Sequence, residues 1–576
     1  MKTYMVENIE KEITIEDIND CYIGLDLGTT NSVLSFMKIL PSKKSYVNVE
    51  VYPFFLYSGG DGYIPTVVSF RNDKQDCRIG REAKKMSGIQ RYDCFKLRLG
   101  EDIEKPLVRG GKNAGEVTRI YLEKLLEKFK KSYGIDRIPR IVATVPETWF
   151  REASNRTARE HLMDIYHQLG YSSSQVVIQS EPVAACAYYC WCYRMKMGDL
   201  FSGHIMVVDY GGGTLDIALC QIMDGTVIKV LDRCGEGEYN GTNGCAGVAF
   251  DEAVAKMVCE ENHILDIDGN PLLHNRMNFE KFRNLIEEQK ILCSEQVGEV
   301  LKHYFETPQD YGEETAFIVE YNEKEYRVTA GILGKCFEEI NQSPLLTCIR
   351  QVRQRFETFG VDETDGEHFQ IMMIGGFSNF YGVEYGVRKE FETLSSESDS
   401  RFGVFSKDGR IIQIFAANDR SFAVSKGAAL LSLGVIRVNP TCPFSLSLLG
   451  LHGSMMGEEI EVPLVQKGEE IQEESKVKYF PDSFTVYDFQ KTKLEFIYDD
   501  GRPDNQGKMH LTLDGNPEIF PFKDPEKDKA EYYVGVTMDF NLIPMLHIKS
   551  RDTGEEKETS LQGLVERLSR PVFHDV

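Results

Sequence analysis

Two stretches of this sequence, IGLDLGTTNSVLSF (23–36) and MVVDYGGGTLDIAL (206–219), decide the fold. Each begins with an apolar strand, continues with an aspartate, one further residue and a glycine-containing turn, and ends with threonine and a second apolar strand. A repeated pattern of this length indicates an internal duplication. We therefore predict two similar lobes, each carrying one hairpin, that face one another across a shared ligand.

The segments around these hairpins alternate between short β-branched runs and amphipathic helical stretches. The runs include IVATVP, QVVIQS and FQIMMIGG, and helical periodicity is clear in 116–133 and 279–293. Strands and helices that alternate in this way predict an α/β architecture with mixed sheets. The pattern continues from residue 21 to residue 436.

After Pro440 the pattern changes to short alternating strands separated by turn residues, from PFSLSLL to MLHIKS. About eight such strands in roughly 120 residues predict an antiparallel β-sandwich. The predicted organisation has five parts: a polar N-terminal extension (1–20), a nucleotide-binding domain (21–436), a linker (437–441), a β-sandwich domain (442–562) and a C-terminal stub (563–576).

The charge and the composition exclude several classes of partner. The formal net charge is -24, and residues 441–576 hold 15 lysines and arginines against 26 aspartates and glutamates. Such a field repels phosphate backbones and anionic lipid, so we expect neither nucleic acid nor a membrane surface as partner. No apolar run is long enough to cross a bilayer, the acidic first 20 residues do not resemble a secretory signal, and the 14 cysteines show no paired framework. These features predict a cytoplasmic protein.

The glycine-rich turns predict a phosphate-binding site. A turn without Cβ obstruction lets backbone N–H groups point into a concavity, and threonine hydroxyls can donate to the same phosphate oxygens. The predicted phosphate-binding residues are Gly28, Thr29, Thr30, Gly211, Gly212, Gly213 and Thr214.

Three aspartates beside these turns predict a metal ion. Asp26 and Asp209 end the first strand of each hairpin, and Asp216 follows Thr214 on the same strand face. Bare carboxylates would repel a polyphosphate, so they make sense with a divalent cation, most simply Mg²⁺ held through its waters.

These residues also carry a family resemblance. LDLGTTNS and VVDYGGGTLD resemble the two phosphate hairpins of the actin, sugar-kinase and heat-shock-70 superfamily, and ATVPE (143–147) and IGGFSN (374–379) lie where its two interlobe connections are expected. SEPVAACAYY (180–189) is similar to the Glu-Pro-x-Ala-Ala helix start of heat-shock-70 proteins. The chain is identified as a divergent member of the heat-shock-70 chaperone family that lacks the helical lid.

The resemblance implies ATP or ADP with Mg²⁺, and K⁺ as a further cation, and it gives individual residues catalytic roles. Lys96 in FKLRLG (95–100) reaches the terminal phosphate, and Glu181 orients the attacking water. Asp26, Asp209 and Thr214 complete the catalytic set around magnesium and phosphate. Slow hydrolysis of ATP to ADP and phosphate is the implied reaction.

The resemblance also implies an adenosine site. Its residues are Gly247, Glu287, Lys290, Ser294, Gly375 and Gly376. Ile291 and Asn379 stand where the family has two arginines next to adenine, which would weaken stacking on the base.

In the second domain, CPFSLSLL (442–449) resembles the first strand of the family's substrate domain, and Leu448 is the implied apolar contact of a peptide groove. The implied partners are unfolded or partner polypeptides and a nucleotide exchange factor. We do not expect a J-domain protein to dock, because Val177, Ser180 and Val183 replace the polar residues of that docking site. We expect a monomer.

The favoured function is that of a chaperone in which slow ATP hydrolysis changes the affinity of the β domain for a polypeptide. An ATP-regulated scaffold for one dedicated partner is an alternative that the sequence does not separate from a chaperone. A small-molecule kinase of the same superfamily is a third possibility, although a sugar kinase has no use for the β domain.

Overall fold

A computed structural model gives the structure of the chain. It describes residues 1–57, 62–71, 77–86, 90–100, 105–107, 111–151, 153–237, 244–266, 269–391, 404–407, 410–413, 422–439, 441–442, 444–451, 459–471, 477–486, 493–499, 508–514, 530–538 and 544–561. The predicted C-terminal stub (563–576) lies outside these residues.

The first hairpin belongs to an eight-stranded mixed sheet. The strand order is β11-β10-β3-β4-β5-β1-β2, with β6 paired to β4. The strands are β1 (Lys2–Val6), β2 (Lys11–Ile15), β3 (Tyr22–Asp26), β4 (Asn31–Lys43), β5 (Tyr46–Pro53), β6 (Ile64–Pro65), β10 (Arg140–Val145) and β11 (Val176–Ser180). β3 pairs antiparallel with β4 and parallel with β10, so the predicted hairpin occupies the middle of the sheet.

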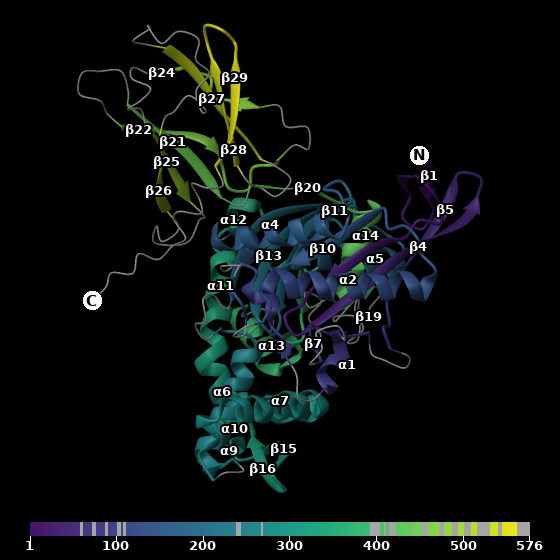
Figure 1. Ribbon diagram of the computed structural model, residues 1–576, viewed down its shortest axis with the longest axis vertical. Coiled ribbons are helices and arrows are strands. Elements are labelled where there is room, and N and C mark those ends of the chain that lie inside the picture. Colours follow the sequence, from purple (N-terminus) through teal and green to yellow (C-terminus); the bar gives the residue numbers. More distant parts are fainter. Residues whose placement is uncertain are drawn as a thin grey trace.

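The residues predicted as a polar extension form a hairpin at the edge of this sheet. β1 pairs antiparallel with β2, and it pairs parallel with β5 through Met5 and Val6. Val6, Ile9, Ile13 and Ile15 are all buried in a hydrophobic core together with residues of β4, β5 and α5 (Glu181–Met197). Figure 1 shows the hairpin in purple beside the long strands β4 and β5.

The second hairpin belongs to a five-stranded sheet with the order β17-β12-β13-β14-β20. Its strands are β12 (Gly203–Tyr210), β13 (Thr214–Met223), β14 (Val227–Gly237), β17 (Phe369–Ile374) and β20 (Arg437–Asn439). β12 pairs antiparallel with β13 and parallel with β17. The first sheet has the same arrangement, because β3 pairs antiparallel with β4 and parallel with β10. The duplication in the sequence therefore has a counterpart in strand topology.

Two helices pack between the sheets. α5 and α14 (Ala423–Leu433) share one hydrophobic core with strands of both sheets. The helices approach closely because Gly427 has no side chain: a Cβ there would lie 1.6 Å from the carbonyl oxygen of Ala184. The sequence starts α5 with Glu181 and Pro182, and α5 ends before Gly198, whose φ of 70° suits glycine.

Further helices pack on each of the two sheets. Residues of α2 and α4 are buried against the first sheet, and residues of α6, α7, α8, α10, α11 and α13 are buried with the second. The helices are α1 (Gly80–Lys85), α2 (Ala114–Tyr133), α3 (Thr148–Arg151), α4 (Ala153–Gln168), α6 (Gly247–Asn262), α7 (Arg276–Leu292), α8 (Ser294–Glu306), α9 (Pro308–Tyr311), α10 (Ala330–Phe337), α11 (Ser343–Arg353), α12 (Phe356–Phe359) and α13 (Tyr381–Glu390). The short strands are β7 (Val68–Phe70), β8 (Cys77–Ile79), β9 (Gln90–Tyr92), β15 (Thr315–Tyr321), β16 (Lys324–Thr329), β18 (Val404–Lys407) and β19 (Arg410–Gln413).

A β-rich region follows β20 and occupies one end of the molecule in Figure 1. One antiparallel sheet has the order β22-β21-β25-β26, and a second has the order β23-β27-β28-β29 with β24 on β27. Apolar residues of both sheets form one common core. The strands are β21 (Ser445–Leu451), β22 (Glu459–Val465), β23 (Lys478–Tyr479), β24 (Phe484–Val486), β25 (Lys493–Asp499), β26 (Lys508–Asp514), β27 (Ala530–Met538), β28 (Pro544–Ser550) and β29 (Glu556–Ser560).

Within the part of the chain that the structure describes, no helix combines the length and the apolar character needed to cross a bilayer.

Candidate functional site

The turns of the two predicted hairpins face one another. A Cβ on Gly213 would lie 2.7 Å from the Oγ1 atom of Thr29, and a Cβ on Gly212 would lie 3.4 Å from the Oγ1 atom of Thr30. Gly28 is required by its own turn, because a Cβ there would lie 2.0 Å from the carbonyl oxygen of Asn31. The two glycine-containing turns therefore meet at one place, with the hydroxyls of Thr29 and Thr30 beside Gly213 and Gly212, as a phosphate-binding site requires.

The three predicted metal-binding aspartates lie beside these turns. Asp26 ends β3, and Asp209 on β12 is paired in register with Asp216 on β13. Asp209 and Asp216 are buried, and the hydroxyl of Thr144 donates to Asp26 Oδ1 at 3.5 Å. The strand register alone brings Asp209 and Asp216 together, because directly opposed residues on one face are neighbours.

A buried ion pair completes the cluster. The Nζ atom of Lys96 lies 2.7 Å from the Oε1 atom of Glu181, and the Lys96 side chain is 2% exposed. Lys96 stands on a single 3₁₀ turn (Phe95–Arg98), and Glu181 is the first residue of α5. The two residues are 85 positions apart in the sequence, and the fold brings their side chains together.

The electrostatics of the cluster show that these groups act on each other. Burial and the Glu181 carboxylate raise the pKa of Asp26 to about 7, and the Lys96 ammonium opposes this rise. Burial, Glu181, Asp216 and Asp26 raise the pKa of Asp209 well above its usual range, again opposed by Lys96. The five groups comprise four carboxylates and one ammonium, so a bound cation would relieve their mutual repulsion.

The donor set fits Mg²⁺ held through water. Among the described residues, no three histidine, cysteine, aspartate or glutamate side chains lie where they could bind one metal ion directly. Mg²⁺ commonly keeps several waters, and carboxylate oxygens are suitable partners for those waters. Asp26, Asp209 and Asp216 would hold the ion in this way, and the ion would supply charge neutralisation for a bound polyphosphate.

The site continues along the start of α6 and the loop after β17. The N–H groups of Gly247 and Val248 donate to the carbonyl oxygens of Gly211 and Gly212 at 3.2 and 2.8 Å, which joins α6 to the phosphate turn. A Cβ on Gly375, whose φ is 84°, would lie 2.5 Å from Asp209 Oδ1. Gly247 and Gly375 therefore lie next to the phosphate turn and the aspartate. Gly376 directly follows Gly375.

Two of the residues predicted for the adenosine site, Lys290 and Glu287 on α7, lie around the buried carboxylate of Asp251. The Nζ atom of Lys290 lies 2.6 Å from Asp251 Oδ1, and both side chains are largely buried. The ammonium also lies 5.3 Å from the ring centre of Phe250. Burial raises the pKa of Asp251 to about 6, Lys290 lowers it, and Glu287 raises it. Lys290 and Glu287 thus lie next to Asp251, and the ammonium of Lys290 is committed to that carboxylate.

The residues at the outer end of this predicted adenosine site are exposed to solvent. Ser294 is exposed and begins α8, and Ile291 is 61% exposed. The Nδ2 atom of Asn379 donates to the carbonyl oxygen of Gly376 in its own loop at 3.3 Å. None of these contacts identifies a nucleobase.

Sequence reasoning missed one aromatic residue in the cluster. The Nζ atom of Lys96 lies 5.8 Å from the ring centre of Trp149, which is 5% exposed on α3. The one feature of the sequence that could have indicated this role is that Trp149 follows the ATVPE segment (143–147) by two positions.

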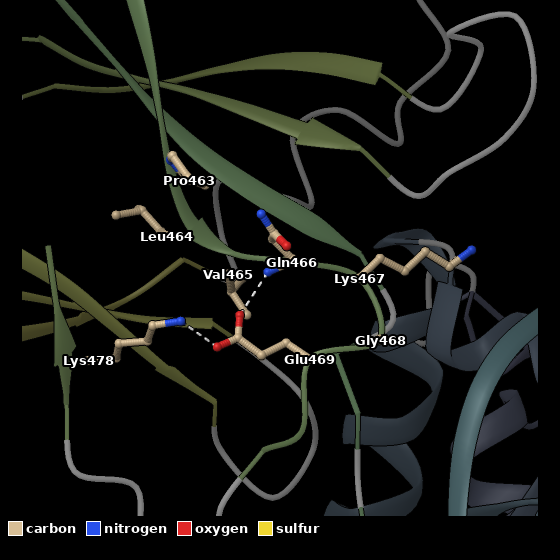
Figure 2. A pocket seen from close by; sticks show the side chains of 8 residues that line it. All are labelled: Pro463, Leu464, Val465, Gln466, Lys467, Gly468, Glu469 and Lys478. Atoms are coloured by element: carbon tan, nitrogen blue, oxygen red, sulfur yellow. Dashed lines mark hydrogen bonds and ion pairs between the residues drawn. The ribbon is translucent and has the colours of Figure 1, made fainter. Parts of the chain in front are cut away.

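Leu448, the predicted peptide contact, is buried, and so are Ser180 and Val183, two of the three residues expected to prevent docking of a J-domain protein. Leu448 on β21 is 2% exposed and belongs to the core of the β-rich region. Ser180 and Val183 are fully buried, and Val177 packs against the core around α5. A pocket in the β-rich region, shown in Figure 2, is lined by residues 463–469 and Lys478.

Mixed sheets with facing glycine-rich hairpins and a buried carboxylate–lysine cluster are the features expected of an actin-like ATPase fold. Residues 108–394 match the family model described as Hsp70 protein. The chain belongs to the Hsp70 family, whose members are ATPases that bind ATP or ADP with Mg²⁺ and recognise polypeptides. Glu181, Asp209 and Gly375 lie inside the matched range, and Asp26 and Lys96 lie before it.

Proposed function

We propose that this protein binds ATP with Mg²⁺ and hydrolyses it slowly, and that the bound nucleotide controls polypeptide binding by the β-rich region. The two sheets with their helices would form the two lobes of an actin-like domain, which close on the nucleotide. The protein would act in the cytoplasm as a chaperone. K⁺, a nucleotide exchange factor and a monomeric state belong to the same proposal.

One observation carries the catalytic part of the proposal. Lys96 and Glu181 form a buried ion pair next to the carboxylates of Asp26 and Asp209, between two turns that can bind phosphate. Phosphoryl transfer depends mainly on positioning and on neutralising charge, and these groups can do both. A γ-phosphate would compete with Glu181 for the Lys96 ammonium, which leaves the Glu181 carboxylate free to orient a water.

Contacts between the β-rich region and the second sheet support the coupling. β20 pairs parallel with β14, and the hydroxyl of Thr441 donates to the carbonyl oxygen of Val230 on β14 at 2.6 Å. The Nζ atom of Lys467 lies 2.8 Å from Asp232 Oδ1, also on β14. Figure 2 shows Lys467 extending from the turn away from Glu469. β14 is the strand next to β13, which carries Thr214 and Asp216.

The test uses Glu181→Gln and Lys96→Met, which keep side-chain size and remove charge. We expect ADP affinity within about threefold of the unchanged protein and ATP turnover reduced about 100-fold, because both groups act at the terminal phosphate. Calorimetry and steady-state phosphate release measure the two quantities. The exposed Glu12→Gln variant is the matched control. Unchanged turnover in both variants would overturn the assignment, and transfer of phosphate to a sugar would point to a kinase.

The proposal that the bound nucleotide controls polypeptide binding needs a separate experiment. We expect ADP and ATP to change the dissociation rate of a fluorescent apolar peptide from the full-length protein. A pull-down that recovers a single stoichiometric partner, together with no peptide binding in either nucleotide state, would identify a dedicated scaffold instead.

A further inference from the structure

We propose that Trp149 is a positioning residue that keeps the Lys96 ammonium in the site while Lys96 changes partners. This inference rests on the proposed ATPase function. The ammonium lies 2.7 Å from the Glu181 carboxylate and 5.8 Å from the centre of the Trp149 ring, and the carboxylates of Asp26 and Asp209 also attract it. The side chains of Lys96, Glu181 and Trp149 are largely or fully buried.

Lys96 needs such a partner because of its own flexibility. A lysine side chain is a point charge on a four-carbon stem with several rotatable bonds. The backbone below it is one 3₁₀ turn that follows Cys94, whose φ is 50°. Neither the stem nor the turn fixes the position of the ammonium, so its contacts must do so.

An aromatic ring suits this task better than a second carboxylate. The ring attracts the cation through its π face without taking up a hydrogen-bond donor of the ammonium. Lys96 can therefore exchange Glu181 for a phosphate oxygen while its attraction to Trp149 persists. In a site from which water is largely excluded, this attraction is stronger than at an exposed position.

The structure fixes the ring by anchoring the short helix that carries it. α3 has only four residues and cannot be stable by itself. Glu147, just before α3, forms a buried ion pair with Arg233 on β14 at 2.9 Å. The ring centre of Phe150 lies 4.4 Å from the guanidinium carbon of Arg159 and 5.4 Å from that of Arg233. These contacts hold α3 against α4 and β14.

Kinetics distinguish positioning from simple packing. In Trp149→Leu we expect kcat to fall about tenfold with KM within about twofold, because the ground state keeps the Glu181 pair. Trp149→Phe keeps a π face and should restore kcat to within about threefold of the unchanged protein. A kcat for Trp149→Leu within twofold of the unchanged value, or no rescue by phenylalanine, would overturn the inference.

Fluorescence gives a second readout that does not depend on a destabilising substitution. The chain has two tryptophans, and Trp191 lies ten residues along α5 from Glu181, about 15 Å away. In Trp191→Phe, Trp149 is the remaining reporter. We expect its emission to change when a non-hydrolysable ATP analogue binds with Mg²⁺, because the ammonium moves relative to the ring.

The control is the same measurement with Lys96→Met added. Loss of the emission change, with analogue binding retained by calorimetry, supports the inference. The same emission change in that variant overturns it. If the unchanged protein binds neither ATP nor the analogue and releases no phosphate, the proposed function fails, and the role of Trp149 fails with it.

Discussion

Asp26 and Asp209 determine how the site responds to pH and to cations at the scale of single residues. Burial and the neighbouring Glu181 carboxylate raise both pKa values, and the value for Asp26 is about 7. In the folded protein without a cation, the Asp26 carboxyl group therefore holds its proton to a much higher pH than an ordinary aspartate does. An unfolded chain has ordinary aspartate pKa values, so the difference between the two states appears in stability.

A pH titration of stability tests this difference. A carboxyl group with a raised folded pKa contributes stability below its unfolded pKa, about 4, and this contribution is lost as pH rises to about 7. We expect Asp26→Asn to be more stable than the unchanged cation-free protein at pH 8, by on the order of 2 kcal/mol, and no more stable at pH 4. Thermal unfolding in the presence of a metal chelator measures this difference in stability at the two pH values.

The complementary measurement is the stability of both proteins after Mg²⁺ and ADP are added. Mg²⁺ with ADP should stabilise the unchanged protein at pH 8 more than it stabilises Asp26→Asn, because a water-held cation relieves the repulsion between the carboxylates. Equal stabilisation of both proteins would show that Asp26 does not face the cation.

The position of a residue in the site could be predicted where it follows from neighbouring residues in the sequence. It could not be predicted where it depends on a partner that is distant in the sequence. Asp26 and Asp209 follow from the hairpin pattern, because strand, turn and carboxylate lie within a few neighbouring residues. The family resemblance implied that Lys290 contacts adenosine, but the local sequence could not reveal the buried Asp251 carboxylate 2.6 Å from its ammonium. Trp149 was missed for the same reason, since Lys96 is distant in the sequence.

At the scale of elements, the N-terminal hairpin β1–β2 is the segment whose structure the sequence revealed least. The stretch KTYMVENIEKEITI reads as polar, and its partner β5 begins some 30 residues after β2 ends. Only pairing with that distant edge turns Val6, Ile9 and Ile13 into core residues. The two glycine-rich hairpins were predictable because each strand's partner is adjacent in the chain.

This packing makes the hairpin a stabilising part of the fold. Ile13 is 4% exposed, so Ile13→Ala removes buried methyl groups and should lower the free energy of unfolding by about 2–4 kcal/mol. Thr14→Ala on the same strand is the matched control, because Thr14 is exposed and should change stability by less than about 0.5 kcal/mol. Chemical denaturation measures both. Equal stability of the two variants would show that the hairpin is only loosely attached.

At the scale of the whole molecule, one core connects the linker to both sheets. Val435 and Ile436, just before β20, are buried with α5, α14 and strands of the two sheets. The N–H group of Arg437 donates to the carbonyl oxygen of Thr226, just before β14, at 2.8 Å, and Lys467 forms its ion pair with Asp232 on β14. A change in the spacing of the sheets would therefore act on the linker directly.

Trypsin cleavage after Arg437 tests this connection. Arg437 is exposed, but cleavage requires β20 to leave β14, so the rate reports how often the linker detaches. We expect ATP and ADP to give rates that differ at least threefold. Lys467→Met removes the ion pair, so cleavage should accelerate about fivefold or more in the state with the slower rate. The Asp232 carboxylate also lies 3.5 Å from Arg355, which limits the effect on folding.

Cleavage after Arg276, whose side chain is 93% exposed at the start of α7, serves as the internal reference. Its rate should be the same in Lys467→Met and in the unchanged protein. If the rate at Arg437 is independent of nucleotide and of Lys467, the linker is held by its own strand pairing alone. The β-rich region would then be attached to the two-sheet part of the molecule without being controlled by it.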